Sequence, residues 1–169
     1  DLEHGKVVFD GGVEDALEVY QLEDTLEIGT EYFGKKIIKR ALLLNEQNII
    51  EYKSDFKLEV FFESNIAIKN LILGLVIKDL NDVELMGINN RHYHQTKINE
   101  NDALRGCIRV VIPEFKLLPG TYKIDLFLGD STVDIEIISD AIKFRVSESL
   151  NNKILNTMNL KINKVFHET

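Results

Sequence analysis

The chain has no tryptophan, a single cysteine and only two prolines among its 169 residues. One cysteine cannot form an intramolecular disulfide, so packing must hold the fold together, and a reducing compartment fits best. The scarcity of proline, with only ten glycines, excludes a disordered or linker-like polymer. No apolar run approaches the ~20 residues that span a bilayer.

Basic residues are also in deficit, with 20 Lys and Arg against 28 Asp and Glu and a formal net charge of -8. Such a surface repels phosphate backbones and anionic lipid headgroups, which disfavours binding to nucleic acid or to a membrane surface. The first residues, Asp1 to Gly5, lack the basic and then apolar layout of a signal peptide. We therefore expect a chain with one main core that neither anchors nor exports itself.

From residue 36 onward, apolar residues recur at every second position, which is the period of a half-buried strand. Strands are predicted over 56–62, 108–112, 122–128 and 142–146. Leu71–Ile77 is apolar on both faces and predicts a central strand, in which Gly74 indicates a bulge or a close backbone approach. Turn residues separate the predicted strands at Asn81-Asp82, Pro119-Gly120, Gly129-Asp130-Ser131 and Ser139-Asp140.

No helix of ordinary length is predicted between residues 36 and 146. The expected fold is all-β: an antiparallel β-sandwich of the jelly-roll or immunoglobulin-like type, with a barrel as the alternative. A short strand over Leu2–Phe9 and a short helix over Val13–Tyr20 precede it, separated by a break at Asp10-Gly11-Gly12. Because eight residues cannot hold a helix unaided, we assign residues 1–20 to the end of a different domain and 21–34 to a linker.

A polar hinge follows residue 146, and the alternation returns after Met158. We expect residues 149–169 to supply a hinge and a last strand, which pairs with its own sheet or is exchanged with a second copy of the chain.

Two local motifs do not predict a functional site. The segment Gly29 to Lys36 nearly spells the phosphate-binding loop, but Lys36 stands where a magnesium-binding hydroxyl is needed, and the flanking residues do not form a strand and a helix. Cys107 lies in a predicted strand with no histidine beside it, so we expect a buried or half-buried thiol and not a nucleophile.

The polar stretch after Ile88 is the candidate binding site. It comprises Asn89, Asn90, Arg91, His92, Tyr93 and His94. Planar amides and guanidinium groups share hydrogen bonds with sugar hydroxyls, and aromatic rings cover their C–H faces. A carboxylate could come from Asp79, Asp82 or Glu84. The alternative is a solvated loop.

The histidine pair within this stretch does not predict a metal site. Zinc needs three or four ligands, and His4, Cys107 and His167 are far away in sequence, so we expect neither a metal nor a cofactor.

Carboxylate pairs such as Asp130 with Asp134, or Glu136 with Asp140, resemble the acid and nucleophile of a glycosidase. Their alternation with Val133, Ile135 and Ile137 instead predicts the solvated face of a strand. No nucleophile-elbow motif is present. We therefore expect a chain that is not an enzyme.

The order of these pieces resembles a known family. Residues 2–20 are similar to the closing strand and helix of polysaccharide-export ABC nucleotide-binding domains. The sandwich resembles the C-terminal domain of Wzt-type O-antigen ABC transporter ATPases. The blocks that carry this likeness are Gly74–Asp79, Met86–Asn90, Ile112-Pro113, Leu117–Tyr122 and Ala141–Val146.

The resemblance implies that residues 35–148 form a carbohydrate-binding domain, often dimeric by exchange of its last strand. It would recognise the terminus of a lipid-linked O-antigen polysaccharide at the cytoplasmic face of the bacterial inner membrane, and couple chain completion to export. Its other partners would be the nucleotide-binding and transmembrane subunits, and the chain would begin at the tail of the ATPase domain, without ATPase motifs. The alternative from another class is a protein-protein interaction domain that docks through a sheet edge and binds no glycan.

Overall fold

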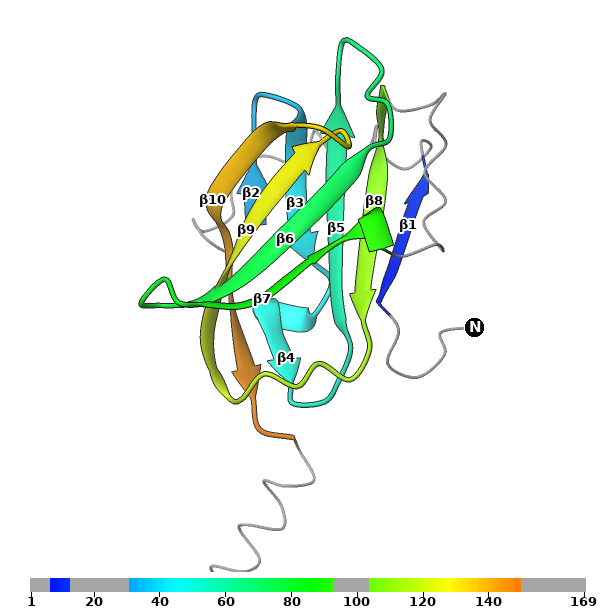
Figure 1. The fold of residues 1–169 in the computed structure, drawn as a ribbon. Helices are drawn as coiled ribbons and strands as arrows, with labels where there is room; N and C mark the ends of the chain where they lie inside the picture. The colour runs from blue at the N-terminus through cyan, green and yellow to red at the C-terminus, as the bar shows by residue number, and fades with distance from the viewer. Residues whose placement is uncertain (1–6, 13–30, 93–103, 150–169) are drawn as a thin grey trace, which may run out of the picture.

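The computed structural model describes residues 7–12, 31–92 and 104–149. Within this part, the chain forms two five-stranded sheets and two short 3-10 turns, and no α-helix. Figure 1 shows one sheet lying in front of the other. The predicted all-β sandwich is therefore confirmed, whereas the predicted helix over 13–20 and the predicted strand after residue 149 lie outside the described residues.

Sheet A consists entirely of antiparallel neighbours. Its order is β1 (Val8–Gly12), β8 (Arg105–Ile112), β5 (Phe56–Glu63), β3 (Ile38–Leu43) and β2 (Glu31–Phe33).

Sheet B has one exception to the antiparallel rule, because β4 and β10 run parallel. Its order is β4 (Ile49–Glu51), β10 (Asp134–Ser147), β9 (Gly120–Gly129), β6 (Ile72–Asp79) and β7 (Glu84–Asn89). The 3-10 turns are η3 (Glu46–Asn48) and η4 (Asn90–His92).

Alternation along each strand separates the core from the outer faces. On β6, Leu73, Leu75 and Ile77 are buried between the sheets, so the residues between them face outward. Aromatic rings fill one end of the core, where the centroids of Phe56 and Phe115 lie 5.1 Å apart. Buried apolar side chains provide the main driving force for stacking the two sheets.

The amino-terminal strand differs from its prediction. Strand β1 continues through the predicted break at residues 10–12 and pairs with β8, and Phe9 is fully buried in the core. Strand β2 likewise forms inside the predicted linker and pairs with β3. The assignment of residues 1–20 to the end of a nucleotide-binding domain remains a prediction.

Two predicted irregularities lie elsewhere. Gly74 pairs in regular register with both neighbouring strands, and the register shift on β6 falls between Ile77 and Lys78, so of the two alternatives predicted for Gly74 the bulge is wrong. The predicted turn at residues 139–140 is also wrong, because β10 runs through it with a register shift between Ile138 and Ile142. Asp140 adopts a φ of 53°, a left-handed conformation that Asp tolerates better than most residues.

In the first half of β10, the buried and exposed faces are the reverse of those predicted. Glu136 pairs with Leu128, which faces the core, and is itself only 7% exposed, whereas Ile135 and Ile137 are 43% and 56% exposed. The carboxylate of Glu136 accepts hydrogen bonds from the backbone N–H groups of Ile37 (3.0 Å) and Ile38 (2.7 Å). These bonds satisfy the buried charge and join the two sheets.

Candidate functional site

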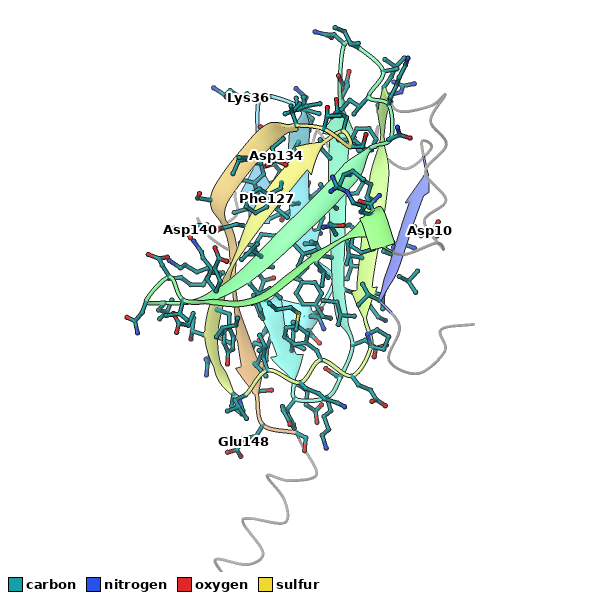
Figure 2. The ribbon with its side chains drawn as sticks, viewed as in Figure 1. Asp10, Lys36, Phe127, Asp134, Asp140 and Glu148 are labelled. Carbon is teal, nitrogen blue, oxygen red and sulfur yellow. The ribbon has the colours of Figure 1, made fainter. Side chains whose placement is uncertain are left out.

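An open groove of about 460 Å³ lies on the outer face of sheet B. Strands β6, β7 and β9 form its floor, and η4 with the β9–β10 loop form its rim. Figure 2 shows Phe127 and Asp134 on this front sheet. Its lining includes two glycines, Gly74 and Gly87, and the side chains of Val76, Asn89, Arg91, Phe127, Asp130, Thr132 and Asp134.

Strand register explains why these residues meet. Gly74 on β6 lies opposite Asn89 on β7 and opposite Phe127 on β9, all three on the outward side of the sheet. One step along, Val76 lies opposite Gly87. Phe127 is partly exposed, so its ring offers an apolar surface beside the polar group of Asn89.

The side chain of Asn90 stabilises the fold. It is 8% exposed, its Oδ1 accepts a hydrogen bond from the N–H of Leu73 (2.7 Å), and its Nδ2 donates to the carbonyl of Leu71 (2.9 Å). Both side-chain groups are used by the backbone that leads into β6, so we remove Asn90 from the set of candidate ligand contacts. Of the predicted residues, Asn89 and Arg91 line the groove.

Arg91 links the two sides of the rim. Its backbone N–H donates to Oδ1 of Asn89 (2.8 Å), and its guanidinium Nη2 donates to the carbonyl of Ser131 in the β9–β10 loop (3.3 Å). The exposed guanidinium is thereby held beside the groove with further N–H donors to offer. The side chain of His92, together with Tyr93 and His94, lies outside the described residues.

The groove obtains one carboxylate, Asp130, from the β9–β10 loop and another, Asp134, from the first position of β10. The Oδ1 of Asp130 accepts hydrogen bonds from the N–H of Val133 (2.9 Å) and from both the N–H and the hydroxyl of Thr132 (2.7 Å each). These donors, the Thr132 hydroxyl first, lower the pKa of Asp130. Asp130 is therefore an ionised acceptor at neutral pH, and is unsuited to the role of a general acid.

The carboxylates anticipated from sequence have other roles. The Oδ1 of Asp79 accepts hydrogen bonds from the N–H groups of Asn81 (2.8 Å) and Val83 (3.0 Å) and so shapes the β6–β7 hairpin. Asp82 pairs with Lys123 at 2.7 Å, and neither it nor Glu84 lines the groove. Sequence reasoning did not place Asp130 and Asp134 in the same groove as Arg91, because pairing across strands, rather than closeness in sequence, brings them there.

An ionic cluster lies on the same outer face, beyond Val76. The ammonium of Lys78 is 3.0 Å from Oδ1 of Asp125 and 2.9 Å from Oδ1 of Asp140. The hydrogen bond with Asp140 is the main cause of a raised pKa for Lys78, and the same bond lowers the pKa of Asp140. Asp140 and Glu136, paired above as glycosidase candidates, are thus occupied by a lysine and by backbone N–H groups, respectively.

Other kinds of site find little support in residues 7–12, 31–92 and 104–149. No group of three or more His, Cys, Asp and Glu side chains in those ranges could hold a metal ion. The same ranges contain no helix long and apolar enough to cross a membrane. Cys107 is buried, as predicted, with its sulfur 3.7 Å from Oε2 of Glu59.

Comparison with known proteins places this fold in a family. The family model of the Wzt C-terminal domain matches residues 34–158. Among solved structures, the crystal structure of the C-terminal domain of Wzt is similar with a TM-score of 0.53 and 20% identity, covering 71% of this chain and 80% of that chain. Comparison with curated proteins finds no match. Because the family model covers more than half of the sequence, the chain belongs to the Wzt C-terminal domain family.

Proposed function

We propose that this chain is a non-catalytic carbohydrate-binding domain that recognises the terminus of a lipid-linked O-antigen polysaccharide. In this role it couples chain completion to export by an ABC transporter at the cytoplasmic face of the inner membrane. The groove on the outer face of sheet B is the observation that carries the proposal.

The groove supports a glycan ligand because it combines two kinds of contact. Phe127 and Val76 offer apolar surface for the C–H face of a sugar ring. An amide, a guanidinium and a carboxylate surround that surface at Asn89, Arg91 and Asp130. These planar groups donate to and accept from neighbouring hydroxyls, so the rim can orient a sugar while the floor supplies contact area.

The direct test is a calorimetric titration of the 169-residue chain with O-polysaccharide released by mild acid from the strain that encodes it. We expect binding by the wild-type chain and about tenfold weaker binding by Arg91→Ala, because a hydrogen bond to a charged group contributes about 1.5–3 kcal/mol. Lys143→Ala, an exposed change on β10 outside the groove, is the matched control. Failure of the wild-type chain to bind the polysaccharide would reject the proposal.

A second candidate function is protein-protein docking without glycan binding. Two observations favour it: β7 has no neighbour on its outer edge within the described strands, and Ile135 and Ile137 are exposed on β10. An edge strand can accept an added strand from a partner. Retention of the purified nucleotide-binding subunit by the chain, with no heat from any polysaccharide, would favour this function over the first.

Homodimerisation belongs to the same proposal, although residues 150–169 lie outside the described part of the chain. We propose that the last strand is exchanged between two copies, since the sequence of that segment alternates as a strand after a polar hinge. Light scattering at micromolar concentration should give the mass of a dimer for the full chain and of a monomer after deletion of residues 150–169. Equal masses for the two forms would contradict strand exchange.

A further inference from the structure

The floor of the groove is made partly by two glycines. Register places Gly74 between Phe127 on one side and Asn89 on the other, and Gly87 beside Val76. A glycine inside a strand forgoes packing and loses more backbone entropy on folding than any other residue. Its presence at two adjacent points of the same face therefore needs an explanation.

The backbone does not require glycine at either position. Neither has a left-handed φ, and a Cβ at Gly74 would lie 3.6 Å from the Cβ atoms of Asn89 and Phe127, an ordinary contact. At Gly87, an added Cβ would meet only Cγ2 of Val76, at 3.8 Å. Gly129 is different, because its Cβ would collide with the backbone carbonyl oxygen of Val133, so the β9–β10 turn does require glycine.

What the two glycines provide is space, bordered by apolar side chains and, beside Gly74, by Asn89. Phe127 and Val76 border it, while the nearest lysine on the same face, Lys78, is paired with Asp125. The charged groups that line the groove, Arg91 and Asp130 among them, belong to its rim. A charged substituent on the floor would lose hydration without gaining a partner, so the space favours an uncharged, C–H-rich group.

We propose that Gly74 and Gly87 determine the specificity of the groove, by leaving room for one compact, uncharged part of the terminal sugar to lie against Phe127 and Val76. This inference rests on the proposed glycan-binding function and adds the chemistry of the part that is read. The rim contacts orient the sugar through its hydroxyls, and the glycine floor admits the ring face or a small apolar substituent. A side chain at either glycine would occupy that volume.

The test compares Gly74→Ala, Gly87→Ala and Gly87→Val with the wild-type chain, by calorimetry with the released polysaccharide and by thermal unfolding. The matched control is Gly120→Ala, which makes the same change on β9 outside the groove and places a Cβ 3.4 Å from the hydroxyl of Tyr122. We expect Gly74→Ala and Gly87→Val to bind about tenfold or more weakly, as for a misplaced methyl group in a fitted pocket. Their unfolding midpoints should stay within about 2 °C of the wild-type value.

The outcomes separate this inference from the function on which it rests. Wild-type affinity in Gly74→Ala and Gly87→Val, with weakened binding in Arg91→Ala, would overturn the glycine inference and leave the glycan site standing. A wild-type chain that binds no polysaccharide would overturn both. If Gly87→Val unfolds, Gly87→Ala decides the matter, since its single methyl makes only an ordinary contact with Val76: weakened binding supports the inference and unchanged binding rejects it.

Discussion

Asn90 holds the start of β6 through a 2.7 Å hydrogen bond from the backbone N–H of Leu73 to its side-chain oxygen. Together with the bond from its Nδ2 to the carbonyl of Leu71, this contact fastens η4 to β6. The residues on either side of Asn90 are thereby fixed at the groove, where Asn89 and Arg91 line it. Asn90 therefore stabilises the fold, and its neighbour Asn89 lines the groove.

This division predicts different effects for the two neighbouring asparagines. Asn90→Ala leaves the buried N–H of Leu73 and the carbonyl of Leu71 without partners, at about 1–3 kcal/mol for each group, so unfolding in urea should shift to markedly lower concentration. Asn89→Ala removes only an exposed bond to the N–H of Arg91, and should cost about 0.5 kcal/mol. Equal destabilisation by the two changes would contradict the structural role of Asn90.

Glu136 should be essential for stacking the sheets. Glu136→Ala leaves the N–H groups of Ile37 and Ile38 unpaired, and should lower the free energy of unfolding by about 2 kcal/mol or more. Glu136→Gln keeps an acceptor oxygen and should cost less. Asp134→Ala, at an exposed position on the same strand, is the control for urea unfolding. A harmless Glu136→Ala would mean that these two hydrogen bonds do not stabilise the sandwich.

Phe127 should contribute to ligand binding through its ring. Phe127→Ala should weaken polysaccharide binding about fivefold or more, because an aromatic contact is worth about 1 kcal/mol beyond its buried area, whereas Phe127→Tyr should retain most of the affinity. Phe33→Ala, at a 42% exposed ring on the edge of sheet A, offers a matched control. Calorimetric titration checks this, and equal affinity in Phe127→Ala and Phe33→Ala would remove the ring from the site.

The ionic cluster predicts a loss of stability in acid. Hydrogen bonds from Lys78 and Lys123 lower the pKa values of Asp140 and Asp82, respectively, below that of an unfolded aspartate, which is about 3.9. The unfolded chain therefore binds more protons near pH 4, and the contribution is present above that pH and lost as the pH falls through the lower folded values.

Thermal unfolding between about pH 3 and 7 should show a decline on the acid side. Asp140→Asn should make that decline shallower, and asparagine tolerates the left-handed backbone of this position. An unchanged acid slope in Asp140→Asn would show that the ion pair with Lys78 does not contribute.

Local patterns predicted most strands, but they did not always predict which face of a strand is buried. The alternation over 56–62 and 122–128 predicts the core faces of β5 and β9 correctly, because buried and exposed positions there differ in polarity. In the first half of β10 the same reasoning reverses the faces, since the sequence there carries acids and β-branched residues in alternation, whereas the core face over 142–146 is predicted correctly. Pairing of Glu136 with Leu128 decides which set points inward, and hydrogen bonds from the other sheet make the buried acid tolerable.

The candidate site was also predictable from the sequence only in part. The stretch from Asn89 to His94 is recognisable by its residue types, and two of its members line the groove. The local sequence does not distinguish the roles of Asn89 and Asn90. They differ in whether the side chain faces toward or away from the backbone of β6. Asp130 in the β9–β10 loop and Asp134 at the start of β10 lie about forty residues further along the chain, and only the β6–β9 pairing brings them to the rim.

The sequence by itself therefore determined the strand-rich class, the positions of most strands and the polar character of the candidate stretch, because these follow from side-chain polarity at neighbouring positions. Only the tertiary structure decided which carboxylates share a groove with Arg91, that Glu136 faces inward, and that Gly74 and Gly87 lie in the same groove as Phe127. Those features depend on register between strands distant in the chain. A shift of one residue would turn every side chain of a strand to the opposite face.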